Sequence, residues 1–167
     1  MGAALERESR LHLAEARRII EVEVASLAAA RANAEQASVL AKLLTGMEEA
    51  SRAGQREKEI SLHAQFHIQI ADMCANPVLT YLVGTLIHLL PAVSASQVSV
   101  PGAGERAQQL HRAIYDAICS GNPAAAREAM VAHMVHEVDV TAKSFQNRQL
   151  NPRLHRASAK HLRRNGR

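Results

Sequence analysis

The sequence predicts an all-α fold, an antiparallel bundle of about six helices, on two observations. Apolar residues recur at helical spacing in six successive segments, and no segment shows the alternation of a strand. The composition is 47% hydrophobic but has no Trp and only two Phe and two Tyr, which favours closely packed helices of Ala, Leu, Val and Ile. A chain of 167 residues is long enough for one domain with a substantial core.

The first two helices are expected over residues 4–32 and from Asn33 to Arg52. Asn33 suits the cap of the second helix, because Gln36 follows at the spacing of a capping box, and Gly54 ends that helix. The apolar positions of the first helix are Leu11, Ala14, Ile19, Val22, Leu27 and Ala30.

A third helix is expected over residues 57–74, with one face that combines apolar and histidine side chains. That face holds Ile60, His63, Phe66, His67, Ile70 and Met73 or Cys74. Asn76 followed by Pro77 is typical of a helix start, because Asn caps the free N–H groups and Pro suits the first turn. The fourth helix should run from there toward Pro91.

The last two helices are expected on either side of a Gly-Asn-Pro tripeptide at 121–123. Gly suits the end of the helix over residues 105–120, while Asn and Pro suit the start of the next, which should run to about Phe145. A loop rich in Ser and Gly is expected at 94–104. The connections are otherwise short, as in an antiparallel bundle.

The net charge of +4 is concentrated at the C-terminal end. Seven of the twenty basic residues lie from Arg148 onward, with no acidic residue, so residues 1–147 hold thirteen basic against sixteen acidic residues, a net of −3. We therefore expect a helical domain over 1–147 and a disordered basic tail over 148–167. Such a tail is either a solvated terminus or a weak, non-specific contact for nucleic acid.

The chain has two cysteines, Cys74 and Cys119, both in apolar helical segments and without a CxxC motif. We expect buried, reduced thiols in a cytoplasmic protein. No apolar run is long enough to span a bilayer, so no membrane association is expected.

Four histidines, His63, His67, His111 and His133, lie on three of the predicted helices. The first two are four residues apart and share a helix face. If all four converge inside the bundle, their imidazoles make a metal site suited to zinc, nickel, copper or iron. Taken singly, each could instead be a hydrogen-bonded residue at the edge of the core.

Several short motifs follow one another along most of the chain. They are Ala16-Arg17-Arg18-Ile19-Ile20-Glu21 with Leu27-Ala28-Ala29, then Phe66-His67, then Asn76-Pro77-Val78-Leu79, then Leu110-His111-Arg112-Ala113-Ile114, and last Ala126, Met130 and His133. In order and spacing they resemble the FCD domain, the all-helical effector-binding domain of FadR-subfamily, GntR-type bacterial transcription regulators. The resemblance covers about residues 16–145.

The resemblance implies a divalent metal, held in many members by one Asp and three His, whose open positions bind a small carboxylate effector. His67, His111 and His133 match the three histidines, while His63 stands where the family usually has Asp. Either His63 completes a cage of four imidazoles, or it turns away and leaves three histidine ligands. Zinc is the expected metal, with nickel or iron as alternatives, and the domain is expected to be a homodimer.

Three further residues are weaker candidates. The resemblance implies that Arg17 could bind the effector carboxylate, although a structural ion pair with Glu21 is an equal alternative. His88 could contact the effector from the fourth helix or be a core histidine. His136, one turn past His133, could support a metal ligand by hydrogen bonding or lie at the surface.

Members of this family read DNA through a winged helix-turn-helix that precedes the effector domain, and we expect the present chain to lack it. The predicted function is therefore effector sensing, without enzymatic activity. A free-standing metal-dependent hydrolase is the alternative, disfavoured because there is no HExxH motif and the acidic residues near the histidines are expected on other helix faces. A metal-free dimerisation bundle is a third interpretation.

Overall fold

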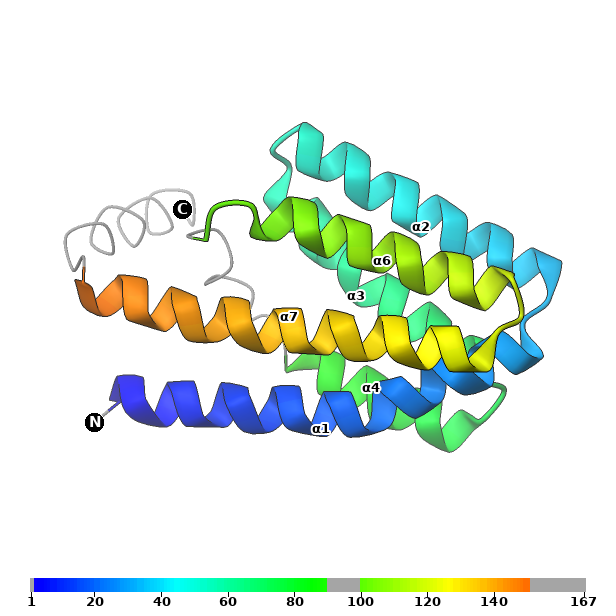
Figure 1. Ribbon diagram of the computed structural model, residues 1–167, viewed down its shortest axis with the longest axis horizontal. Coiled ribbons are helices and arrows are strands. Elements are labelled where there is room, and N and C mark those ends of the chain that lie inside the picture. Colours follow the sequence, from blue (N-terminus) through cyan, green and yellow to red (C-terminus); the bar gives the residue numbers. More distant parts are fainter. Residues whose placement is uncertain (1, 90–99, 151–167) are drawn as a thin grey trace, which may run out of the picture.

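The computed structural model describes residues 2–89 and 100–150, with side chains over 8–89 and 100–147. These residues form six helices and no strand: α1 (Gly2–Arg31), α2 (Ala34–Arg52), α3 (Arg56–Met73), α4 (Pro77–His88), α6 (Ala103–Cys119) and α7 (Pro123–Leu150). Successive helices reverse direction, with α1 and α7 packed side by side (Figure 1). The predicted all-α antiparallel bundle is confirmed.

The helix starts follow the predicted capping residues. Asn33 accepts a hydrogen bond from the backbone N–H of Gln36 at 2.9 Å, and the Gln36 side chain accepts one from the Asn33 N–H at 3.2 Å. Asn76 likewise accepts from the N–H of Val78 at 3.1 Å. After α6, Gly121 adopts a φ of +64°, a conformation that favours glycine, and so allows the tight reversal into α7.

Several helix boundaries differ from the prediction by one to five residues, and those of α6 and α7 have a local reason. The helix α6 begins at Ala103, two residues early, because Gly102 turns the chain with a φ of +74° and Ala103 is already buried. The helix α7 continues past Phe145 to Leu150. Most of the predicted loop at 94–104 and the tail from residue 151 lie outside the described residues.

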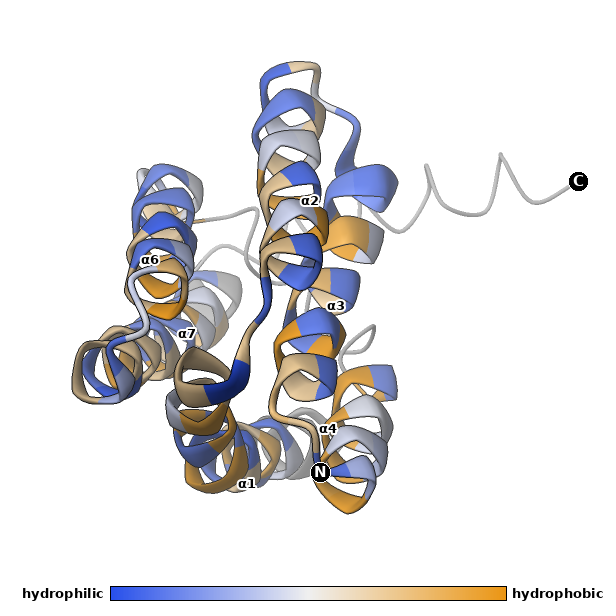
Figure 2. Cartoon of the chain, turned by 90° about the vertical axis from the view of Figure 1, so that its right-hand side faces the viewer, coloured by the Kyte–Doolittle hydropathy of each residue, from blue (hydrophilic) through white to orange (hydrophobic). Residues whose placement is uncertain are grey.

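The core is built from small residues on α1 and larger apolar residues on the other helices. Ala25 and Ala28 of α1 are fully buried, and their size lets the neighbouring helices approach closely. Each helix has polar and apolar residues in turn, as Figure 2 shows. The larger buried side chains are Leu40, Leu44, Phe66, Ile70, Met73, Val83, Ile87, Ile114, Ile118, Met130 and Met134.

The two cysteines differ in environment. Cys74 is buried as predicted, but Cys119 is exposed, so that prediction was wrong. Cys119 ends α6 and lies off the buried stripe that Ile114 and Ile118 form. None of the described helices combines the length and the apolar character needed to cross a membrane.

Candidate metal and effector site

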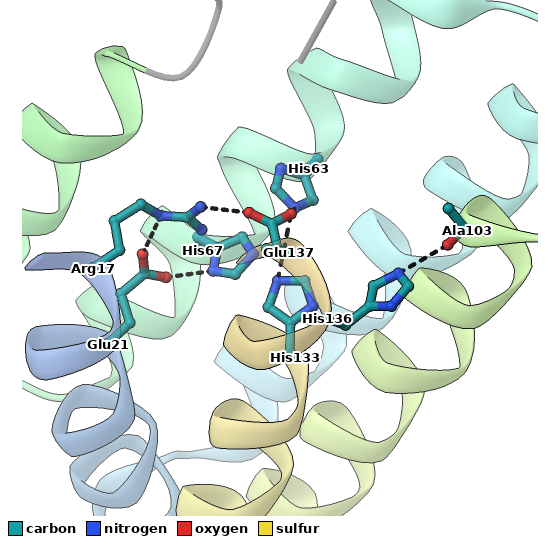
Figure 3. Close-up of polar contacts among 8 residues, drawn as sticks. All are labelled: Arg17, Glu21, His63, His67, Ala103, His133, His136 and Glu137. Atoms are coloured by element: carbon teal, nitrogen blue, oxygen red, sulfur yellow. Dashed lines mark hydrogen bonds and ion pairs between the residues drawn. The ribbon is translucent and has the colours of Figure 1, made fainter. Parts of the chain in front are cut away.

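Six polar or charged side chains are buried together inside this apolar bundle. They are Arg17, Glu21, His67, His111, His133 and Glu137, each no more than 6% exposed. Polar groups are costly to bury unless they are paired or bind a ligand, so this cluster marks the candidate site. Figure 3 shows most of it.

The four predicted histidines converge. His63 and His67 come from α3, His111 from α6 and His133 from α7, and one ring nitrogen from each lies within 4.8 Å of the others. The ring centroids of His111 and His133 are 4.5 Å apart, and those of His63 and His67 are 4.7 Å apart.

The local sequence explains why these rings point inward. The four-residue spacing on α3 places both histidines on the helix face that carries the buried Ile70. His111 lies three residues before the fully buried Ile114 on α6, and His133 lies three residues after the fully buried Met130 on α7. Each histidine is therefore part of a buried helical stripe.

Several of the buried ring nitrogens in the cluster lack a protein partner. Among the described residues, Nε2 of His67, Nε2 of His111 and both ring nitrogens of His133 are buried and have no hydrogen-bond partner. Leaving such a nitrogen unsatisfied costs about 1–3 kcal/mol, so the arrangement calls for a ligand. Four imidazole nitrogens at this spacing fit a divalent transition metal.

The same environment keeps three of the four histidines, His63, His111 and His133, neutral. Burial, together with the neighbouring His67, lowers the pKa of His63 to about 3. Burial also lowers the pKa of His111 and that of His133 well below the ordinary value. Neutral imidazoles present the lone pairs that metal binding requires.

Two glutamates and an arginine adjoin the histidines (Figure 3). Arg17 donates from Nε to Glu21 and from Nη1 to Glu137, both at 2.6 Å. Glu21 in turn lies 2.5 Å from Nδ1 of His67. The i,i+4 pair of Arg17 and Glu21 that the sequence allowed is thus present, as part of a buried network that connects α1, α3 and α7.

The charges of this network stabilise one another. Burial alone would raise the pKa of Glu21, but Arg17 and His67 lower it to about 2. Arg17 likewise holds the pKa of Glu137 well below the ordinary value, against the effect of burial. Both carboxylates are therefore ionised at neutral pH.

The expectation that acidic residues near the histidines fall on other helix faces was wrong for Glu21 and Glu137. Glu137 is four residues after His133 and therefore on the same face of α7. That spacing could have identified it from the sequence. Glu21 reaches His67 from another helix, and its separation of 46 residues gives no such signal.

A cavity of about 80 Å³ opens onto one side of the cluster. His63, His111 and Glu137 are among its polar lining residues, and Met47, Ala107 and Val140 are among its apolar ones. The side chain of His63 is 18% exposed, whereas those of His67 and His133 are fully buried.

His136 and His88 lie away from the cluster. His136 lines the cavity, and its Nε2 is 3.0 Å from the Ala103 carbonyl oxygen (Figure 3). This contact joins α7 to the start of α6 and does not involve the histidine cluster. His88 is exposed on the last turn of α4 and does not line this cavity. The structure therefore does not bring His88 to the site.

An all-helical bundle with a buried histidine cluster and an adjoining cavity has the form of a ligand-binding domain. The chain belongs to the FCD domain family, whose model matches residues 12–136. This membership confirms the resemblance found in the sequence.

The chain is similar to one curated protein, HTH-type transcriptional regulator LutR of Bacillus subtilis (strain 168). The two are 28% identical over 153 residues, which cover 87% of this chain and 69% of LutR. The family and this relative are transcription regulators and not enzymes, which agrees with the prediction that the chain has no enzymatic activity.

Two solved structures are also similar. One, named Streptococcus agalactiae GntR, has 29% identity and a TM-score of 0.67 over 77% of this chain and 58% of its own. The other is described as "Lar controls the expression of the Listeria monocytogenes agr system and mediates virulence", with 16% identity and a TM-score of 0.71 over 82% of this chain and 65% of its own. The chain thus spans less than two thirds of either structure, and the second shows the fold alone.

Proposed function

We propose that this FCD domain is the effector-sensing domain of a GntR/FadR-type transcription regulator, binding a small carboxylate at a divalent metal. His63, His67, His111 and His133 would hold the metal. The observation that carries the proposal is the set of buried ring nitrogens, on His67, His111 and His133, that lack a partner among the described residues. Zinc suits such a nitrogen-rich set, and nickel or iron are alternatives.

When bound, the metal supplies positive charge and open coordination positions for an anion. The protein supplies Arg17, whose Nη2 is buried and has no hydrogen-bond partner in the described part of the chain. Arg17 carries one positive charge and Glu21 and Glu137 one negative charge each, so the three sum to −1 without the metal and to +1 with it. A site of this charge favours an anionic effector.

The cavity supports a small effector. Its volume of about 80 Å³ suits a small molecule beside the histidines. Its apolar lining residues, among them Ala107 and Val140, suit a short hydrocarbon portion, while the metal and Arg17 would take the carboxylate.

Effector binding would be transmitted through the helices that it connects. The network joins α1 through Arg17, α3 through His63 and His67, and α7 through His133 and Glu137. A ligand that binds one arrangement of these helices more tightly shifts the population toward it. In the proposed regulator the domain is a cytoplasmic homodimer, and a winged helix-turn-helix domain outside these 167 residues contacts DNA.

Metal analysis of the purified protein tests the central claim. We expect close to one divalent transition metal per chain in the wild type, and much less in His67→Ala and His111→Ala variants, because each loses a ligand nitrogen. His12→Ala, at an exposed histidine of α1, is the matched control and should keep its metal. A wild type with no more metal than the two ligand variants would favour the metal-free dimerisation bundle.

A thermal-shift screen tests the effector. Acetate, succinate and citrate should each be compared with uncharged acetamide, before and after treatment with a chelator. A carboxylate that binds the native metal-loaded protein raises the melting temperature by mass action, and the rise should vanish once the metal is removed. A rise that the chelator leaves unchanged would contradict metal-anchored binding.

A further inference from the structure

The carboxylate of Glu137 faces the histidine cluster without forming a hydrogen bond to it. Its Oε1 lies 3.6 Å from Nε2 of His63 and 4.0 Å from Nε2 of His133 (Figure 3). Both distances are longer than a hydrogen bond between nitrogen and oxygen. The three atoms come from α3 and α7, and His63 and Glu137 also line the cavity.

These separations are those of atoms that share one metal ion. With metal–ligand bonds of about 2.0–2.2 Å, two ligand atoms are about 3.0 Å apart at a right angle, about 3.5 Å apart at the tetrahedral angle and about 4.2 Å apart across the ion. Distances of 3.6 and 4.0 Å fall inside this range.

The two oxygens of Glu137 have different neighbours. Oε2 accepts the hydrogen bond from Arg17 at 2.6 Å, while Oε1 is the oxygen near His63 and His133. Carboxylates that bind a metal through one oxygen are commonly hydrogen-bonded through the other, which fixes their orientation. Arg17 therefore positions Glu137 and does not compete with the cluster for it.

We propose that Glu137 is a fifth ligand of the metal, an anionic oxygen donor beside the four imidazoles. This inference rests on the proposed function, since it requires that the histidines bind a metal. It adds a hard, negatively charged ligand to an otherwise neutral set, which favours zinc, iron(II) or nickel over softer cuprous copper. Five protein ligands also leave a six-coordinate ion one position for an effector atom.

The direct test compares Glu137→Gln with the wild type, using Co²⁺ and Zn²⁺ added to chelator-treated protein at a fixed pH. Gln retains the size of Glu and an oxygen that can accept from Arg17, but removes the charge. We expect the affinity for both metals to fall at least about tenfold. Glu128→Gln, the same change at an exposed position of α7, is the control and should leave the affinity unchanged.

The visible spectrum of bound Co²⁺ reports the number of ligands. Loss of one ligand lowers the coordination number, and Co²⁺ absorbs more strongly with four ligands than with five or six. The Glu137→Gln protein should therefore bind Co²⁺ more weakly yet show altered, stronger absorption. Far-UV circular dichroism of the metal-free variants checks that all are folded.

A second substitution separates ligation from a purely structural role. Because the His63 nitrogen and the Glu137 oxygen are neighbours, His63→Asp places a carboxylate close to the same point. His63→Asp should raise the metal affinity more in the Glu137→Gln background than in the wild type, giving a coupling of at least about tenfold.

Three results would overturn the inference. A Glu137→Gln protein with wild-type affinity and spectrum would show that Glu137 does not bind the metal. A weaker affinity with an unchanged spectrum and no coupling to His63→Asp would show that it acts only through Arg17. If the wild type binds no metal, the proposed function fails as well, whereas the first two results leave that function intact.

Discussion

Glu21 of α1 and His67 of α3 lie in direct contact, with 2.5 Å between a carboxylate oxygen and Nδ1 of the imidazole. Because the pKa of Glu21 is lowered to about 2, its carboxylate is ionised and can only accept, so the proton belongs to Nδ1 of His67. This fixes the tautomer that turns the Nε2 lone pair toward the other histidines.

Removing this contact should weaken metal binding even though Glu21 would not touch the metal. We expect Glu21→Gln to lower the affinity for Zn²⁺ by about 10–100-fold, because the orientation and basicity of His67 are lost. Titration with a competing chromophoric chelator measures this. Glu15→Gln, at an exposed position on the same helix, is the control, and an equal affinity in both variants would contradict the role of Glu21.

The metal-free protein should lose stability as the pH falls below about 6.5. His63 has its pKa lowered to about 3 in the folded state and that of His111 is lowered too, so the unfolded chain takes up their protons first. Each such proton lowers the free energy of unfolding by about 1.4 kcal/mol per pH unit, until the folded-state pKa is reached.

Urea unfolding of chelator-treated protein at pH 7.5, 6.0 and 5.0 measures this dependence. Glu21 adds to the loss only below about 4.5, where its carboxylate becomes protonated in the unfolded chain, and the loss continues toward its folded-state pKa of about 2. A free energy of unfolding that stays constant from pH 7.5 to 5.0 would show that His63 and His111 are not held neutral.

Arg17→Lys should impair effector binding more than the exposed change Arg18→Lys. Lys keeps the charge but cannot contact Glu21, Glu137 and a carboxylate with one planar group. Loss of one charge-assisted hydrogen bond, about 1.5–3 kcal/mol, corresponds to roughly a 10- to 100-fold weaker affinity. Calorimetric titration measures this affinity, using the carboxylate that raises the melting temperature in the thermal-shift screen. Equal affinities in the two variants would show that Arg17 does not bind the effector.

Ala75→Gly should stabilise the protein. Ala75 lies between α3 and α4 with a φ of +51°, which costs a non-glycine residue about 1–2 kcal/mol. Glycine removes this cost but gains freedom in the unfolded chain, so the net gain is about 0.5–1 kcal/mol in the free energy of unfolding. Ala53→Gly, at a residue with a φ of −82°, is the control and should destabilise. Destabilisation by both changes would contradict strain at Ala75.

The fold could be predicted closely because its signals are local. Capping residues such as Asn33 and Asn76, and the apolar spacing within each helix, act over three or four residues and are visible in the sequence. The end of α7 was missed because the helix continues past Phe145 without an apolar pattern to mark it. Cys119 was wrongly predicted to be buried because the segment around it is apolar, although its own side chain is exposed.

The site was predicted only in part because its partners meet across the bundle. The four histidines could be proposed from helix spacing and resemblance, but the contact of Glu21 with His67 depends on how α1 packs against α3. Glu137 could have been predicted to lie near the histidines, since it follows His133 by one helical turn. With Glu137 as a ligand, the negative charge that His63 does not provide would come from α7.

The unequal exposure of the four histidines gives the candidate site two different faces. The side chain of His63 is 18% exposed and lines the cavity with His111 and Glu137, whereas His67 and His133 are fully buried behind them. In the proposed metal site, His63 would be the ligand most open to solvent, while packing would hold His67 and His133 in place. The cage would therefore have one face that solvent reaches and one that the core fixes.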